Sequence, residues 1–175
     1  MLGLQSDTVR LCAHQEAWAA KAEEAIRALR EAFGPAAVDV CHVGSTAVPD
    51  LRAKPILDLA VGVRSLPDAL GRIPAVEEAG FRHVPKNDNE WQVFFSRVGE
   101  DGSVTHHVHA VLYGGPEWRR YLLFRDRLRR DERARRRYER LKLRLCEQYP
   151  NDRARYTESK QDFILALLAE EEGKR

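Results

Sequence analysis

The pattern of apolar and polar residues changes along the chain between the period of a helix and the period of a strand. Residues 15–33 repeat large apolar side chains every three or four positions, and Gly34-Pro35 follows, which predicts an amphipathic helix that ends there. Residues 38–43 alternate as in a strand, and residues 56–63 are almost continuously apolar, as in a strand covered on both faces. This part of the chain therefore predicts a helix, two strands and an ordered loop between the strands.

The middle of the chain predicts further strands of the same sheet. Residues 66–79 predict a helix interrupted by a proline, and residues 81–84 a short strand. Residues 91–98 and 105–112 predict two longer strands, because a Gly-Glu-Asp-Gly turn between them favours a hairpin.

The last third of the chain predicts helices. One helix begins at Pro116, and residues 129–137 lack large apolar side chains, so we expect a turn there with Asp131 as the cap of a new helix. The last predicted helix places Tyr156 and Lys160 one turn apart. The order of elements predicts one α/β (α+β) domain over residues 1–175, a mixed sheet flanked by helices with a C-terminal helical cluster.

Composition narrows the class of protein. The 175 residues are 43% hydrophobic and 32% charged, and no apolar run approaches the ~20 residues of a membrane-spanning helix. We therefore expect a globular protein of the cytoplasm with no membrane partner. The three cysteines are odd in number and widely spaced, which argues against a disulfide framework and against a zinc ribbon.

The basic charge is local. Residues 117–147 hold 13 lysines and arginines against 6 acidic residues, although the whole chain carries a net charge of only +2. Such a cluster suggests a nucleic-acid-binding accessory protein. The interleaved acidic residues instead favour a solvated helix laced with ion pairs, so nucleic acid is the weaker partner hypothesis.

A short stretch around a glycine turn carries the candidate chemistry. Gly44 allows backbone amides to approach a phosphate, and Ser45 and Thr46 add hydroxyl groups. Lys54 supplies positive charge in the following loop, and Asp58 brings one carboxylate into an apolar strand, where it is able to hold a divalent cation. The alternative is structural, with Asp58 accepting backbone amides of the loop and the hydroxyl groups capping a turn.

Two histidines share one face of a later predicted strand. Strand alternation puts His107 and His109 on the same side of residues 105–112. Together with Asp58 they suggest either ligands of a metal such as Mn²⁺ or Zn²⁺, or a general base and phosphate donors. The structural alternative is a pair of hydrogen-bonded histidines that pack under a helix and have no role in binding or catalysis. We expect His42 to orient the glycine turn and Arg125 to point inward in support.

These residues resemble a known family. The run His-Val-Gly-Ser-Thr-Ala-Val-Pro at 42–49, followed by Lys-Pro-Ile-Leu-Asp-Leu at 54–59, resembles the signature of the GrpB family in the nucleotidyltransferase-fold superfamily. Similar motifs cover residues 11–18, 107–109, 117–126 and 156–164. The resemblance implies a nucleoside triphosphate as substrate, a divalent metal (Mg²⁺ or Mn²⁺, with Zn²⁺ as a further candidate), and phosphate contacts from Tyr156 and Lys160.

One position departs from the superfamily pattern. A second carboxylate normally stands two residues after the first on the same strand, and here that position is Ala60. The first hypothesis is a metal-dependent enzyme that transfers a nucleoside monophosphate to a small molecule or a protein. The second is a module that kept the phosphate pocket, binds a nucleotide or a phosphorylated metabolite, and has lost catalysis. The acceptor, the base, the metal and the oligomeric state stay open.

Overall fold

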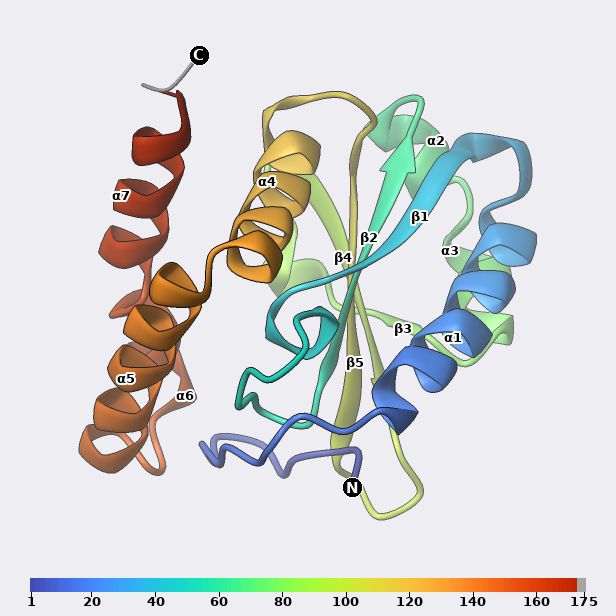
Figure 1. Ribbon diagram of the computed structural model, residues 1–175. Helices are drawn as coiled ribbons and strands as arrows, with labels where there is room; N and C mark the ends of the chain where they lie inside the picture. Colours follow the sequence, from blue (N-terminus) through green and yellow to red (C-terminus); the bar gives the residue numbers. More distant parts are fainter. Residues whose placement is uncertain (173–175) are drawn as a thin grey trace.

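The computed structural model, which describes residues 1–172, is built on a five-stranded mixed sheet (Figure 1). The sheet order is β1-β2-β5-β4-β3, so the two central strands come from distant parts of the chain. The strands are β1 (Ala37–Val43), β2 (Leu57–Val63), β3 (Arg82–His83), β4 (Gln92–Val98) and β5 (Val104–Leu112). The mixed sheet and the flanking helices confirm the predicted fold class.

The centre of the sheet is its one parallel pair, β2 and β5, and every other named pair is antiparallel. In this pair Asp58 lies opposite His107, and Ala60 lies opposite His109. Residues that lie opposite each other point to the same face of a sheet. The register therefore brings the two histidines to the side of the sheet that carries Asp58, as strand alternation predicts.

Helices cover both faces of the sheet (Figure 1). The helices α1, α2 and α3 pack on one face, and α4 crosses the other. The predicted helix over residues 66–79 is two short helices, since Gly71 follows the first and Pro74 lies in the first turn of the second. Their bounds are α1 (Ala17–Phe33), α2 (Leu66–Leu70), α3 (Ile73–Glu78) and α4 (Pro116–Arg130).

The C-terminal helices form a column beside the sheet (Figure 1). Asp131 caps the second of the two basic helices, and its side chain accepts the amide hydrogen of Ala134 at 2.9 Å, which confirms the predicted turn. The predicted last helix is broken near Ser159, so Tyr156 lies in one short helix and Lys160 in the turn after it. The helices are α5 (Glu132–Gln148), α6 (Arg153–Glu158) and α7 (Gln161–Glu172).

Apolar contacts fix this column to the loop that follows β1. Val48 and Leu51 are fully buried in one cluster with side chains of α4, α5 and α7. Val9 of the N-terminal segment packs against Leu145 and Tyr156. The loop from Gly44 to the start of β2 is therefore held between the sheet and the helical column. No helix within residues 1–172 is long and apolar enough to cross a membrane.

Candidate functional site

The glycine turn lies directly against the carboxylate of Asp58. Gly44 adopts φ +69°, in the left-handed region, and a Cβ atom added to it would lie 2.5 Å from Asp58 Oδ2. Both its backbone angle and its neighbour therefore require glycine. Ser45 follows it at the start of a 3-10 turn that covers Ser45–Ala47.

Asp58 and the two predicted histidines lie together in the structure. Asp58 Oδ1 lies 3.3 Å from His107 Nδ1 and 3.9 Å from His109 Nε2. The three side chains are 33%, 24% and 16% exposed, so a ligand is able to reach them from solvent. The structure therefore brings these three partly exposed side chains together, at a position called the Asp58 site below.

The histidines determine the charge of Asp58. Burial disfavours its ionised form, but the neighbouring imidazole rings of His107 and His109 outweigh this and hold the pKa of Asp58 well below its usual range. Burial lowers the pKa of His107, and the attraction of Asp58 opposes that change. Asp58 is consequently an anion at any physiological pH.

Two predicted phosphate ligands, Lys54 and Lys160, meet at the ring of Tyr156. The Nζ atoms of Lys54 and Lys160 lie 5.3 and 4.6 Å from the centroid of that ring. Burial lowers the pKa of Lys54 to about 8, against the attraction of Asp58. Burial, followed by the positive charge of Lys54, lowers the pKa of Lys160 to about 7. The two amines are therefore crowded and poorly solvated beside a single carboxylate.

A third lysine, which sequence reasoning missed, joins them from α5. Lys142 is only 1% exposed; its Nζ donates to Ser45 Oγ at 3.2 Å and to the carbonyl oxygen of Arg52. Burial and then the charge of Lys160 lower its pKa well below the usual value. In the sequence, burial of Lys142 is indicated only by its position on the apolar side of the helix, next to Tyr138, Leu141 and Leu145. In an arginine-rich segment that signal is easily taken for one more surface charge.

Two further predicted residues, His42 and Arg125, lie next to the glycine turn inside the protein. His42 Nε2 lies 2.9 Å from Thr46 Oγ1, and Thr46 is only 2% exposed. The hydroxyl group of Thr46 is therefore buried and hydrogen-bonded to His42. Arg125 points inward and donates to the carbonyl oxygen of His42 at 3.1 Å. Burial lowers the pKa of His42 to about 4, which keeps its ring neutral. These contacts join His42 to the glycine turn and show that Arg125 points inward; the orienting role of His42 stays a prediction.

The donor set does not amount to a complete metal site. Within residues 1–172, no group of three or more His, Cys, Asp or Glu side chains is arranged to hold a metal ion. Ala60 lies where a second carboxylate would approach Asp58, and His109 occupies the opposite position on β5. A divalent cation held by Asp58 would need oxygen ligands from a bound phosphate to complete its coordination.

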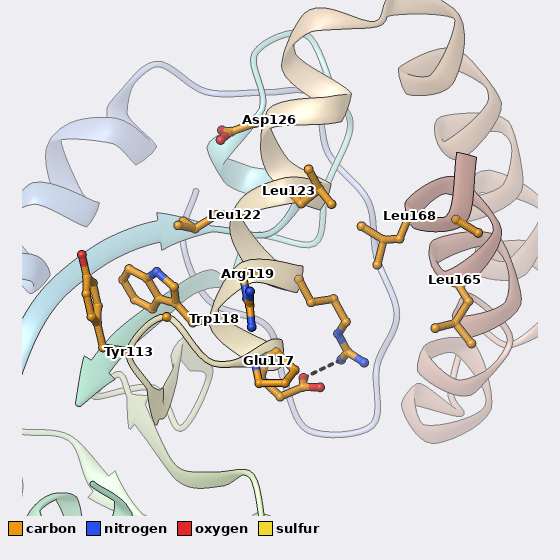
Figure 2. A pocket seen from close by; sticks show the side chains of 13 residues that line it. Tyr113, Glu117, Trp118, Arg119, Leu122, Leu123, Asp126, Leu165 and Leu168 are labelled. Atoms are coloured by element: carbon orange, nitrogen blue, oxygen red, sulfur yellow. Dashed lines mark ion pairs between the residues drawn. The ribbon is translucent and has the colours of Figure 1, made fainter. Parts of the chain in front are cut away.

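Two other surface features lie apart from the Asp58 site. The basic helices carry ion pairs such as Arg136 with Glu132 at 2.5 Å and Arg137 with Glu170 at 3.5 Å, as expected for a solvated helix. An apolar groove of about 960 Å³ lies between α4 and α7 (Figure 2). Leu123 of α4 and Leu165 and Leu168 of α7 line it, and none of the predicted site residues does so.

The chain is similar to known proteins over nearly its whole length. The sequence model of a family described as "GrpB protein" matches residues 8–170. A "Glutamate-rich protein GrpB" of Alkalihalophilus pseudofirmus is 34% identical over 173 residues, which are 97% of this chain and 99% of that protein. The crystal structure of the conserved protein GrpB from Enterococcus faecalis superposes with a TM-score of 0.82 at 29% identity, and the match covers 92% of this chain and 96% of that one.

A more distant likeness concerns the fold alone. The Cid1 poly(U) polymerase, in a crystal structure with MgGTP bound, superposes with a TM-score of 0.54 at 14% identity. The match covers 77% of this chain and 44% of the polymerase. The sheet and its flanking helices are therefore similar to those of a nucleotidyltransferase.

Proposed function

Because this chain belongs to the GrpB family and has a nucleotidyltransferase-like fold, we propose that its Asp58 site binds the phosphates of a nucleoside triphosphate. In this proposal the protein transfers the nucleoside monophosphate to a hydroxyl group or an amine of a small molecule or a protein. Gly44 and Ser45 contact the phosphates, Lys54 and Lys160 neutralise the triphosphate, and His107 or His109 handles the proton of the acceptor. Tyr156 holds the two lysines in place.

The crowding of lysines is the observation that carries the proposal. Burial lowers the pKa of all three lysines; the charge of Lys54 adds to this at Lys160, and the charges of Lys160 and Lys54 add to it at Lys142. The negative charge of Asp58 opposes the change at Lys54 and at Lys160. Keeping several poorly solvated amines together is costly unless an anion joins them. A polyphosphate supplies that negative charge, and charge-assisted hydrogen bonds to its oxygens are short and strong.

The second candidate is a nucleotide-binding or phosphometabolite-binding module without catalysis. It is favoured by Ala60 and by the incomplete set of metal ligands within residues 1–172. In that case the same lysines bind phosphate, but no bond to phosphorus is made or broken. The two candidates therefore share a ligand class and differ in turnover and in metal dependence.

Thermal unfolding and pyrophosphate release separate these candidates. We expect ATP, GTP, CTP or UTP to raise the melting temperature, because a ligand that binds only the folded state stabilises it. The enzyme hypothesis predicts pyrophosphate release that requires Mg²⁺ or Mn²⁺ and an acceptor, and that Asp58→Asn lowers roughly 100-fold or more. Stabilisation without turnover or metal dependence would support the binding module. If Asp58→Asn leaves transfer intact, the assigned role of Asp58 is wrong.

A further inference from the structure

The side chain of Gln92, at the start of β4, lies beside the ring of His109. Its Oε1 lies 3.0 Å from His109 Nδ1, and its Nε2 donates to the carbonyl oxygen of Asn87 at 2.9 Å. Because a carbonyl oxygen only accepts, the Asn87 contact fixes which end of the amide faces the histidine. The end that faces the ring is an oxygen, which also only accepts, so Nδ1 of His109 must carry a hydrogen in this contact.

A second partner of the same nitrogen allows either protonation state. The hydroxyl oxygen of Tyr121 lies 3.0 Å from His109 Nδ1. A hydroxyl group is able to donate to a bare nitrogen or accept from a protonated one. Of the two partners of Nδ1, Gln92 is therefore the one that requires a hydrogen there, and Tyr121 is able to accept that hydrogen or to donate its own.

We infer that Gln92 is a positioning residue that holds His109 in the tautomer with its hydrogen on Nδ1, so that Nε2 presents a lone pair to the Asp58 site. His109 Nε2 lies 3.9 Å from Asp58 Oδ1, on the side where the proposed substrate binds. His107 Nδ1 lies closer to that oxygen, at 3.3 Å. A distance of 3.9 Å is too long for a hydrogen bond, so the contact with Asp58 does not require a hydrogen on His109 Nε2.

This tautomer assigns the acceptor's proton to His109, and this step rests on the proposed function. As the acceptor oxygen or nitrogen forms its bond to the α-phosphorus, its proton passes to His109 Nε2. The bond from that phosphorus to the bridging oxygen breaks, and pyrophosphate leaves with the electron pair. The resulting imidazolium lies beside the negative Asp58, which stabilises it, while Gln92 keeps the Nδ1 hydrogen bonded.

Nitrogen-15 NMR of the histidine rings tests the inference without substrate. The His109→Asn spectrum identifies the His109 signals among those of the six histidines. In the wild-type protein we expect the hydrogen of neutral His109 on Nδ1. Gln92→Met, which keeps the side-chain length but removes the acceptor, should shift the tautomer ratio about fivefold toward Nε2, the effect of one hydrogen bond of about 1 kcal/mol. Tyr121→Phe is the matched control, because it removes the other partner of Nδ1 and should keep the hydrogen there.

Gln92→Glu keeps an acceptor for His109 Nδ1 but loses the donor to the Asn87 carbonyl oxygen. We expect the hydrogen to stay on Nδ1 in this variant, which gives a second reading if the methionine variant unfolds. A wild-type hydrogen on Nε2, or the same ratio in wild type, Gln92→Met and Gln92→Glu, would overturn the inference. The outcome is independent of ligand binding. If the tautomer is as expected but no nucleotide binds, the proposed function fails and the role of Gln92 stands.

Discussion

The two faces of β2 differ in what their side chains do. On one face Leu57, Leu59 and Val61 are fully buried in the core that packs under α1. On the other face Asp58 is partly exposed beside two histidines, and Ala60 packs against side chains of α4. Consecutive residues of β2 therefore lie alternately in an apolar core and beside charged side chains.

The contrast separates stability from function within one strand. Burial of apolar surface on the α1 face stabilises the fold, by about 25 cal/mol per Å² removed from water. The Asp58 face carries an ionised carboxylate and poorly solvated lysines, which cost stability unless they are paired. We conclude that changes on the first face should act on unfolding, and changes on the second mainly on ligand binding.

The largest effect on stability is expected from Leu59→Ala. This side chain is fully buried in the α1 core, so truncation removes apolar contacts and leaves a cavity. We expect the free energy of unfolding to fall by about 2–5 kcal/mol, measured by urea denaturation. A change below about 1 kcal/mol would mean that the α1 face does not carry the stability assigned to it.

The next effect is expected from Gly44→Ala on the Asp58 face. The added Cβ would meet both a left-handed backbone and Asp58 Oδ2, so we expect a loss of about 1–3 kcal/mol together with loss of nucleotide binding. Gly102→Ala is the matched control, because Gly102 has φ +78° but no atom within 4 Å of the added Cβ. Equal effects of the two variants on binding would show that contact with Asp58 does not matter.

A smaller effect is expected from the pH dependence of stability. Lys54 and Lys160 have a pKa of about 8 and about 7 when folded, below the ordinary 10.5. Between pH 7 and 10.5 the unfolded state therefore binds more protons, and these lysines make stability rise with pH. Urea denaturation across this range should show a shallower rise for Lys160→Met than for wild type. The exposed control Lys86→Met should keep the wild-type slope, and an unchanged slope in Lys160→Met would contradict the lowered pKa of Lys160.

The smallest effect is expected on the outer side of α5. The ion pair of Arg136 and Glu132 joins side chains that are 70% and 61% exposed. Pairs of this kind contribute about 0–1 kcal/mol and are screened by salt. Glu132→Gln should therefore leave unfolding and nucleotide binding within experimental error. A clear loss of binding would mean that the basic helix takes part in recognition.

The sequence allowed prediction of those features that depend on local patterns. Strand alternation was sufficient to place His107 and His109 on one face, and the glycine turn identified the loop beside Asp58. The sequence did not show the break near Ser159, because neither glycine nor proline lies there. Lys142 and Gln92 were missed because their roles arise from contacts across the fold, with Ser45 and His109, and no local spacing encodes such contacts.

Calorimetric titration with ATP and with tripolyphosphate tests the central claim most directly. Wild-type protein is compared with the double variant Lys54→Met/Lys160→Met, and Lys86→Met serves as the surface control. We predict that wild type and the control bind at least one of these ligands, and that the double variant binds it at least tenfold more weakly, because two charge-assisted contacts are lost. If the double variant binds as tightly as wild type, or if neither ligand binds to wild type, the Asp58 site is not the polyphosphate-binding site that we propose.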